Sequence, residues 1–481
     1  MQGHSGVGNL RLFHGGDCVQ SAHPFRRPKA ALHQRYHAVR KKLLSTRHST
    51  AGVLPAVGLQ VMEPSNTETT DDGRHTEAGR VGRSTIGQSF SPRRNSLNLL
   101  RLIFAVIVIF SHSITIGQFG SESLLGKSTY GTVPLYAFFG ISGFLIAGSA
   151  ARNNVGRYLW QRFLRIFPAF WVCLVVTAFV FGTIAWLHLN PALSRTCGLH
   201  CYLTEPNGAL GYVTHNFWLQ VNQSVIAGTG VLGGFFGFGW NGSLWTLEYE
   251  FLCYLLLAAL SVIGLLKRRF LVALIAAATW IAVVVIISVP TLRADFSPLH
   301  KGAILVFFGF DIDIMNLLVL LSVFLSAALI YLYRERIPDS GAIALASTVL
   351  FFAGFVLPLG EGAPQNFLTS LDLTAIFSVY PVIWLGIHLP FARFCSVNDY
   401  SYGVYIYAFP IQLLLAMWGV NKWGYLPYTF MALVAVFPVA MASWWGVEKH
   451  ALKLKKVKVP WPSRSGPTWK SSPSATSRSA D

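Results

Sequence analysis

Runs of about 20 apolar residues recur along this 481-residue chain between residues 97 and 447, and they constrain its fold more than any other feature. That length is what an α-helix needs to cross a bilayer, where every backbone polar group must be hydrogen-bonded within the protein. The runs do not alternate apolar and polar residues, as the strands of a membrane β-barrel would. The sequence therefore predicts an all-α, polytopic bundle of membrane helices.

We predict ten membrane spans, at about 97–116, 132–150, 166–187, 244–266, 270–289, 314–333, 341–358, 371–390, 401–419 and 426–447. A further apolar stretch, 303–310, is too short to cross alone. It ends at Asp311 and Asp313. We interpret it as a re-entrant or interfacial piece, and the two aspartates as surface residues. An eleventh span is the main alternative to this count.

The chain carries a formal net charge of +18, although only 12% of its residues are charged. Nucleic-acid-binding proteins are also basic, but here much of the charge lies in the tails and short loops, which suits membrane topology and anionic lipid better. Lys and Arg are enriched in cytoplasmic loops. With a cytoplasmic N-terminus, the inner loops carry ten of these residues before the C-terminal tail, and the outer loops carry five. Both termini are therefore predicted to be cytoplasmic, with the long loop 188–243 outside.

Composition divides the chain into three parts. Residues 1–95 are rich in His, Arg, Ser, Gly and Thr without apolar periodicity, so we predict a disordered basic extension. Met62 begins a more ordinary polar segment and is our hypothesis for the translation start. Residues 96–450 form the membrane domain, and 451–481 a basic, Ser/Pro-rich cytoplasmic tail. Cys197 and Cys201 lie close together in the outer loop, where a disulfide is one possibility. A zinc site would need more ligands nearby, and no metal is predicted.

Arg101 and His112 share the first predicted span, with ten residues between them. Eleven residues advance an α-helix by three turns plus about 20° and by about 16 Å, so the two side chains lie on one face. Ionisable groups inside a membrane are costly and usually belong to a site. The alternatives are that Arg101 reaches the interface and that His112 is an ordinary hydrogen-bonded bundle histidine.

Glu250 lies in the fourth span, at a predicted depth close to that of His112. A carboxylate beside an imidazole fixes its tautomer and favours a general base. Glu248, two residues earlier, points to another side of the helix, and an interhelical hydrogen bond is the favoured interpretation for it. For Glu250 the alternative is an interhelical hydrogen bond.

Arg162 and Arg165 share one helical face near the predicted inner surface, beside Arg157. Arginine forks suit phosphate and pyrophosphate oxygens. A cytosolic phosphate-bearing donor such as acyl-CoA would fit them. The alternative is that they only anchor the helix according to the positive-inside rule.

Five sequence features, in order, give the chain a resemblance to a known family. They are Arg101 with His112, FFGISGFLI at 138–146, RFLRIFP at 162–168, SLWTLEYE at 243–250 and DYSYGVYIYAFP at 399–410. Together they resemble the acyltransferase-3 family of integral membrane O-acyltransferases, over roughly residues 95–450. We interpret 138–146 itself as close helix packing and Tyr402 and Tyr405 as packing or interfacial residues.

The resemblance implies a bacterial inner-membrane enzyme that acylates surface glycans such as polysaccharides or lipopolysaccharide. It implies that Arg101 and His112 are essential, that Arg162 and Arg165 form the donor site, and that Glu250 is the acidic residue of the fourth span. Many members have a histidine where this chain has Ala408. A catalytic base is therefore not assigned to that span.

The predicted reaction moves an acyl group, most often acetyl in this family, from cytosolic acyl-CoA to a glycan hydroxyl. His112 would act as general base or carry the acyl group. A transporter or flippase of a glycan or lipid-linked intermediate is the chief alternative, and a sensor or scaffold without chemistry is another. A transporter would favour inverted repeats, and the sequence shows no convincing symmetry between its halves.

Overall fold

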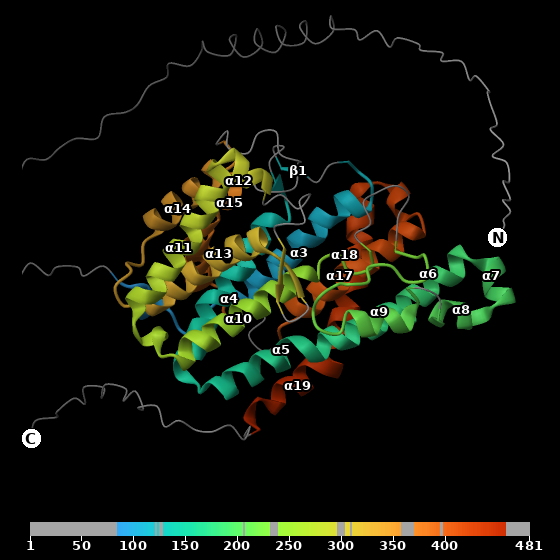
Figure 1. Cartoon of the computed structure of the whole chain (residues 1–481), viewed down its shortest axis with the longest axis horizontal. Helices are drawn as coiled ribbons and strands as arrows, with labels where there is room; N and C mark the ends of the chain where they lie inside the picture. Colours follow the sequence, from blue (N-terminus) through green and yellow to red (C-terminus); the bar gives the residue numbers. More distant parts are fainter. Residues whose placement is uncertain are drawn as a thin grey trace, which may run out of the picture. The chain divides into compact units, whose positions relative to one another are not determined.

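A computed structural model describes residues 84–120, 123–124, 128–204, 207–230, 239–295, 304–307, 310–356, 370–394 and 398–457 of the chain (Figure 1). All of them belong to one compact unit, Arg80–Asp481. Most of the predicted N-terminal extension, with Met62, lies outside the described residues, as does the tail from 458 to 481.

Eight helices in the described part of the chain are long and apolar enough to cross a membrane, and each matches a predicted span. They are α3 (Leu97–Ile116), α4 (Thr132–Arg152), α5 (Val155–Val176) continued to Leu189, α10 (Trp245–Val262), α11 (Arg269–Ser288), α13 (Ile314–Leu332), the run Leu371–His388 that ends in α16 (Val379–His388), and the run Tyr425–Lys456 that starts with α18 (Tyr425–Ser443). The two other predicted spans form shorter apolar helices, α14 (Gly341–Ala353) and α17 (Ser401–Met417). The multi-pass all-α class is confirmed, with eight full-length spans where ten were predicted.

The third span begins earlier than predicted. It starts at Val155, where the Asn154 side chain accepts from the backbone N–H of Arg157 at 2.9 Å and caps α5. It continues past Pro168 through a π-helical turn, Thr177–Phe181, into α6 (Gly182–Leu189). The 35-residue run would be about 52 Å long, well beyond the thickness of the hydrocarbon core. Arg162 and Arg165, predicted to share one helical face near the start of this span, therefore lie well inside the helix.

Close packing of α4 against α13 confirms the interpretation of residues 138–146. A Cβ atom added to Gly143 would lie 2.2 Å from the Phe324 carbonyl oxygen, so only glycine allows the two backbones to approach this closely. Gly148, further along α4, is covered in the same way by the Tyr331 ring. Small residues thus fix how α4 and α13 pack at the centre of the bundle.

Helices α3 and α17 run in the same direction. The Gln412 amide donates to the Ile109 carbonyl at 2.9 Å, and Asn421 donates to the Gly117 carbonyl at 3.2 Å. Helix α18 returns beside them, since the Tyr425 hydroxyl donates to the Phe110 carbonyl at 3.0 Å. The starts of α3, α5 and α17 therefore meet the end of the Tyr425–Lys456 run at one end of the bundle. We call this the arginine end, because it carries Arg101, Arg162 and Arg165.

Part of the predicted disordered extension is folded. Residues 84–95 include the short helix α2 (Ile86–Ser89), which Thr85 caps and whose Ile86 is fully buried. The Ile86 backbone N–H donates to the Ile337 carbonyl at 3.0 Å, and Ser84 accepts from Asp339 at 2.7 Å. At the other terminus, α19 (Lys449–Lys453) and a turn at Leu454–Lys456 extend the last helix into the predicted tail. The folded unit thus exceeds the predicted 96–450 at both ends.

The predicted re-entrant piece is a β-hairpin. Strand β3 (Ile304–Phe307) pairs antiparallel with β4 (Phe310–Asp313), with Ile304 opposite Asp313. Asp311 is exposed, as predicted, but Asp313 caps α13 by accepting from the Asn316 N–H at 2.7 Å. A second hairpin joins β1 (Ser123–Leu124) to β2 (Ser128–Thr129). No eleventh span is found among the described residues.

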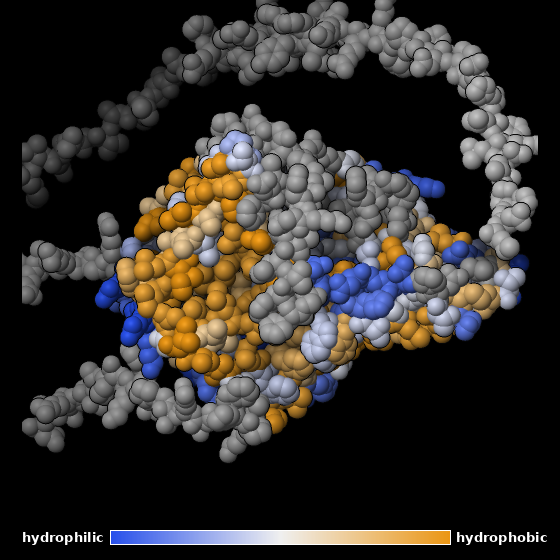
Figure 2. Space-filling view, in the orientation of Figure 1, coloured by the Kyte–Doolittle hydropathy of each residue, from blue (hydrophilic) through white to orange (hydrophobic). Residues whose placement is uncertain are grey.

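The described part of the long loop 188–243 contains three short helices, α7 (Pro191–Thr196), α8 (Gly198–Thr204) and α9 (Ala209–His215). Cys197 and Cys201 form a disulfide within it. Figure 1 shows α7 and α8 at the far end of α6, whereas α9 lies beside the stretch that joins α5 to α6. Figure 2 shows a broad hydrophobic area over α11, α13 and α14 on the face that it presents, as a lipid-facing surface requires. Exposed Phe270, Leu345 and Val349 belong to these helices.

Candidate active site

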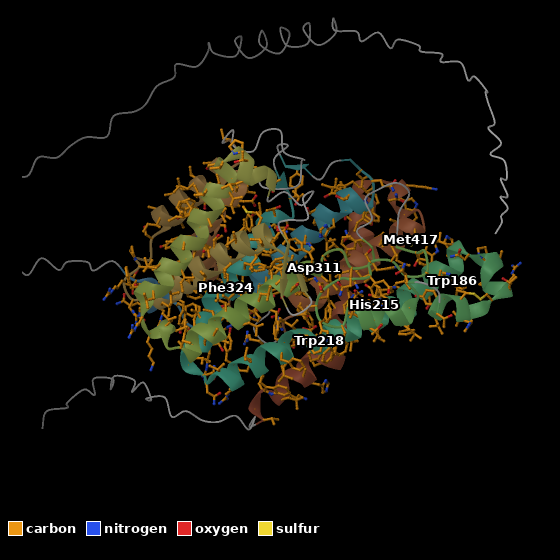
Figure 3. The ribbon with its side chains drawn as sticks, in the orientation of Figure 1. Trp186, His215, Trp218, Asp311, Phe324 and Met417 are labelled. Atoms are coloured by element: carbon orange, nitrogen blue, oxygen red, sulfur yellow. A yellow bond between two sulfur atoms is a disulfide. The ribbon has the colours of Figure 1, made fainter. Side chains whose placement is uncertain are left out.

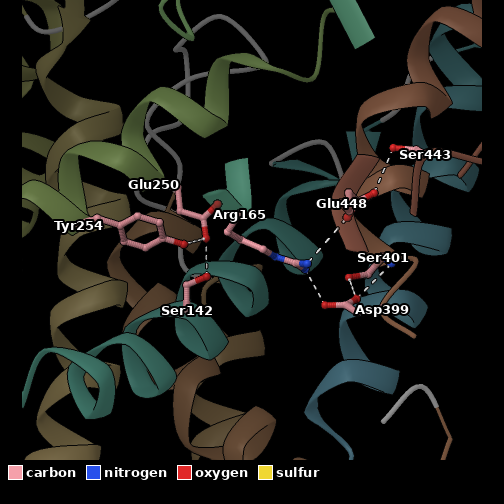
Figure 4. A network of polar contacts seen from close by, with 8 residues as sticks. All are labelled: Ser142, Arg165, Glu250, Tyr254, Asp399, Ser401, Ser443 and Glu448. Carbon is pink, nitrogen blue, oxygen red and sulfur yellow. Dashed lines mark hydrogen bonds and ion pairs between the residues drawn. The ribbon is translucent and has the colours of Figure 1, made fainter. Parts of the chain in front are cut away.

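Arg165 is the centre of a buried ion-pair network at the arginine end (Figure 4). Its guanidinium donates to Asp399 at 2.5 Å and lies 3.8 Å from Glu448. The side chain is 12% exposed and covers the Tyr402 ring, with its Cζ 5.6 Å from the ring centroid. A buried charge is tolerated when it is paired and hydrogen-bonded. Arg165 therefore joins α5 to the segment just before α17 and to the end of the last span.

Asp399 is fixed as the anionic partner in this network. Ser401 donates to it from its hydroxyl at 2.5 Å and from its backbone N–H at 3.2 Å. Burial raises the pKa of Asp399, but the charges of Arg165 and Arg101 together with the Ser401 hydrogen bonds outweigh burial, so the pKa of Asp399 is lowered. Glu448 is held in turn by the Ser443 hydroxyl at 3.1 Å.

Glu250 forms a second polar group in Figure 4, close to Arg162. Its carboxylate accepts from the Ser142 hydroxyl at 2.5 Å and from the Tyr254 hydroxyl. The Arg162 Cζ lies 5.9 Å from the centroid of the Tyr254 ring, and the charge of Glu250 acts on Arg162. The structure thus brings Glu250 together with a predicted donor-site arginine, through residues of α4, α5 and α10.

Arg101 lies between these two groups. Its charge acts on Asp399 and Glu448 and also on Tyr254. The Nε atoms of Arg101 and Arg162 are buried, and neither bonds to a described residue. Buried donors without partners are costly, and they are typical of sites that a ligand completes. The three predicted arginines Arg101, Arg162 and Arg165 are therefore brought together, and two of them keep unused donors.

The remaining predicted arginine, Arg157, is exposed at the start of α5. Lys455 joins the cluster, because the charges of Arg165 and Arg162 act on it from α5. Its turn is held against α5 by the Trp160 indole, which donates to the Leu454 carbonyl at 3.2 Å. Lys455 belongs to the segment predicted as a cytoplasmic tail, and Glu448 and Tyr254 were not among the predicted site residues. The signal available for Glu448 was an acidic residue at the end of an apolar run.

His112 lies eleven residues after Arg101 in α3, beside α17. Its ring meets Phe409 edge-on, with the centroids 5.2 Å apart. Ala408, at the position where many relatives were expected to have histidine, is buried next to Phe409. One turn earlier in α17, Tyr405 donates to the Ser243 carbonyl at 2.5 Å and is hydrogen-bonded to Thr246. The N-terminal end of α10 therefore packs on the same face of α17 as His112.

Comparison with known proteins identifies the family of the chain. The family described as an acyltransferase domain matches residues 94–445, well over half of the chain. The chain belongs to the acyltransferase-3 family. This acyltransferase is 27% identical to an O-acetyl transferase of Shigella phage Sf6 over 368 residues, which cover 75% of this chain and 96% of that protein. It is 25% identical to nodulation protein 10 of Rhizobium leguminosarum bv. viciae over 378 residues, 76% of this chain and 95% of that protein.

No solved structure matches the acyltransferase. Its fold therefore rests on the helices described above and its activity on the family. Eight candidate spans and the family together make it a multi-pass membrane O-acyltransferase, which transfers groups other than amino-acyl groups. Within the described residues, no cluster of His, Cys, Asp and Glu could hold a metal ion.

Proposed function

We propose that the acyltransferase moves an acetyl group from cytosolic acetyl-CoA to a hydroxyl of a cell-surface or exported glycan, across the bacterial inner membrane. The observation that carries the proposal is that α3 connects both ends of the site. Arg101 stands in the cation cluster, and His112 follows about 16 Å along the same face of the helix. A donor held by its phosphates at the arginine end would extend its pantetheine arm toward His112.

Arg101, Arg162 and Lys455 are the cations that we assign to the phosphates of the donor. Arg101 and Arg162 keep buried Nε donors that no described residue uses, and arginine forks suit phosphate oxygens. Arg165 differs, because Asp399 and Glu448 already compensate its charge. We assign it the role of holding α5, α17 and the last span in place around the donor. Exposed Arg157 would attract the donor at the mouth of the site.

His112 is assigned to the chemistry at the other end. As a general base it would take the proton from the acceptor hydroxyl while the oxygen attacks the thioester carbonyl. The bond between carbon and sulfur breaks, and the leaving thiolate receives that proton from the imidazolium. Alternatively, the imidazole carries the acetyl group between donor and acceptor. We assign Glu250, which Ser142 and Tyr254 hold close to Arg162, to the positioning of that arginine for the donor.

The disulfide supports the orientation. Disulfides persist in oxidising compartments such as the periplasm and are rare in the cytosol. Cys197 and Cys201 lie in the loop that follows α6. The long run Val155–Leu189 starts at the arginine end and ends at this loop. This side is therefore assigned to the periplasm and the arginine end to the cytosol, which agrees with the excess of Lys and Arg in the predicted inner loops.

The test uses membranes from the bacterium that encodes the chain, after deletion of its gene and complementation with wild type or His112→Ala. Labelled acetyl-CoA is supplied, and label in the purified surface glycan is counted. Wild type should restore labelling and His112→Ala should not. Equal labelling by both would exclude the histidine mechanism. Loss of glycan export in the deletion strain, with acetylation unchanged, would favour a transporter.

A further inference from the structure

Glu248 is a buried carboxyl group that the proposed mechanism does not use. It lies in the first turn of α10, is only 8% exposed, and is more buried than Glu250 two residues later. No residue in the described part of the chain donates a hydrogen bond to its Oε1 atom. A buried acceptor without a donor costs about 1–3 kcal/mol, and more for a charged group. An intramembrane acid of this kind is by default a candidate for function.

The surroundings of Glu248 increase the free-energy cost of burying its carboxyl group. The charge of Asp311, in strand β4, acts on Glu248. The neighbouring Tyr249 hydroxyl accepts from the Asp313 backbone N–H at 3.1 Å, and Gln220 donates to the Asp311 carbonyl at 3.3 Å. The hairpin and the loop before α10 therefore meet above the start of this helix. Because Glu248 and Asp311 are two acids close to each other, hydrogen-bond donors are needed to stabilise them.

A second buried acceptor without a partner lies five residues earlier. The Ser243 side chain is 4% exposed, and its hydroxyl bonds to no described residue. Its backbone carbonyl accepts from Tyr405, one turn before Phe409, and Phe409 packs on the His112 ring. Ser243 thus borders the part of α17 that faces His112, whereas Glu248 borders the hairpin. The two unused groups thus lie at the start of α10, one toward α17 and one toward the hairpin.

An exposed aromatic residue lies in the loop that meets the hairpin above the start of α10. Trp218 is 61% exposed, and its ring packs on Phe167, with the centroids 6.4 Å apart. Phe167 packs in turn on Phe251, which lies three residues after Glu248 on the same side of α10. Figure 3 labels Trp218 and Asp311, which lie in the loop before α10 and in the hairpin. An indole offers a flat apolar surface with a polar edge, which suits one face of a sugar ring.

Neither the helix dipole nor a bound metal ion explains this arrangement as fully as a hydroxyl-bearing ligand does. An acid in the first helical turn is stabilised by the helix dipole, but the dipole supplies no donor to Oε1 and leaves the nearby Asp311 uncompensated. A metal ion would need further ligands, and the described residues contain no such cluster. A ligand with several hydroxyl donors would satisfy both Glu248 and Ser243.

We propose that Glu248 and Ser243 form a binding subsite for a sugar unit of the acceptor glycan, next to Trp218. The carboxyl group of Glu248 accepts from one or two sugar hydroxyls, and Ser243 holds the chain on its way to His112. This inference rests on the proposed function, because it names the acceptor side of the same reaction. According to this proposal, the residues at the start of α10 select the acceptor glycan.

The experiment titrates glycan purified from the deletion strain against the detergent-purified enzyme with labelled acetyl-CoA. Glu248→Gln keeps the size of the side chain and removes the charge. We expect the KM for glycan to rise about tenfold or more, as the loss of a charged hydrogen bond predicts. The KM for acetyl-CoA should change less than about twofold. Ser243→Ala should raise the glycan KM by a smaller factor. Because Oε1 has no donor in the described residues, the unfolding temperature of Glu248→Gln should not fall.

The matched control is Glu335→Gln, the same substitution at a glutamate whose side chain is 56% exposed on another loop; both KM values should stay at the wild-type level. An unchanged glycan KM in Glu248→Gln would overturn the subsite. So would a fall in thermal stability accompanied by equal rises of both KM values, which a structural role predicts.

Direct binding of fluorescently labelled glycan separates this proposal from the proposed function. Binding by wild type and His112→Ala but not by Glu248→Gln would support the subsite, even if wild type transferred no label and the proposed reaction failed. Equal binding by all three proteins, or binding by none, would overturn it.

Discussion

Arg165 and Asp399 are 234 residues apart in sequence, and their ion pair at 2.5 Å ties the middle of α5 to the start of α17. Both side chains are largely buried, at 12% and 14% exposure. Glu448 adds a second acid from the last span at 3.8 Å. The arginine end of the site is therefore built from three helical segments that meet at one guanidinium.

Removing either partner of this pair should destabilise the protein. Arg165→Met leaves Asp399 and Glu448 buried without their cation, and Asp399→Asn removes the main compensation of Arg165. Breaking a buried pair in this way typically costs about 3–5 kcal/mol. Thermal unfolding in detergent measures the loss. Arg336→Met, at an exposed position, is the control. A double variant, Arg165→Met with Asp399→Leu, should recover part of the stability, and failure to couple would contradict the pair.

The ion pair also predicts a pH dependence. The pKa of Asp399 is lowered in the folded protein, so its contribution is fully present above its ordinary pKa of about 4. It is lost only as pH falls through the lowered value. The difference in unfolding temperature between wild type and Asp399→Asn should therefore be present at pH 8 and shrink below about pH 4. A difference as large at pH 3 as at pH 8 would show that the ionised carboxylate of Asp399 does not contribute it.

The sequence predicted the spans well because apolar length is a local property. Each of the eight long helices matches a predicted run, and Gly143 was rightly interpreted as a packing residue. The start of α5 was missed because Arg157, Arg162 and Arg165 made residues 155–165 too polar for a span. Acids from distant segments, Asp399 and Glu448, make that polarity tolerable. Such compensation is fixed only by the tertiary fold.

The candidate site was predicted in part for the same reason. Arg101 and His112 could be related because they share one helix, whose geometry is known in advance. The neighbours of Glu250 could not, since Ser142 and Tyr254 meet it from another helix and from the next turn of its own. The burial of Glu248 depends on a hairpin that pairs residues 304–313, which apolar content alone did not distinguish from a membrane segment.

Substitution of His112 should abolish turnover and leave donor binding intact. A positioned general base contributes about 10²–10⁴ in rate. His112→Ala should therefore lose at least a hundredfold in kcat, whereas the Kd for acetyl-CoA should stay within about twofold. Phe409→Leu, which removes the ring contact with His112 and keeps an apolar side chain, should have a much smaller effect. A rate loss in Phe409→Leu as large as in His112→Ala would indicate that packing, and not the imidazole, is essential.

Lys455 provides a test of the donor site that the sequence alone did not suggest. If it contacts a phosphate, Lys455→Ala should raise the KM for acetyl-CoA by about tenfold at low salt. The effect should diminish as salt screens the interaction. Lys453→Ala is the matched control, because Lys453 lies two residues away and is exposed. Equal effects of the two variants would reduce Lys455 to one of several surface charges.

Gly143 and Gly140, one turn apart on α4, provide a matched test of helix packing. A methyl group at Gly143 would lie 2.2 Å from the Phe324 carbonyl oxygen and 2.9 Å from the Ala327 Cβ, so α4 and α13 must separate to admit it. Overpacking of this kind costs about 1–3 kcal/mol.

A methyl group at Gly140 would meet its nearest atom, in Val379, at 3.7 Å, which is an ordinary contact. Alanine is also favoured over glycine in a helix by about 1 kcal/mol. Gly143→Ala should therefore unfold at a lower temperature than wild type in detergent, and Gly140→Ala at the same or a higher one. If Gly143→Ala were as stable as Gly140→Ala, the close approach of α4 and α13 would be refuted, because the Phe324 carbonyl belongs to the backbone and cannot rotate away.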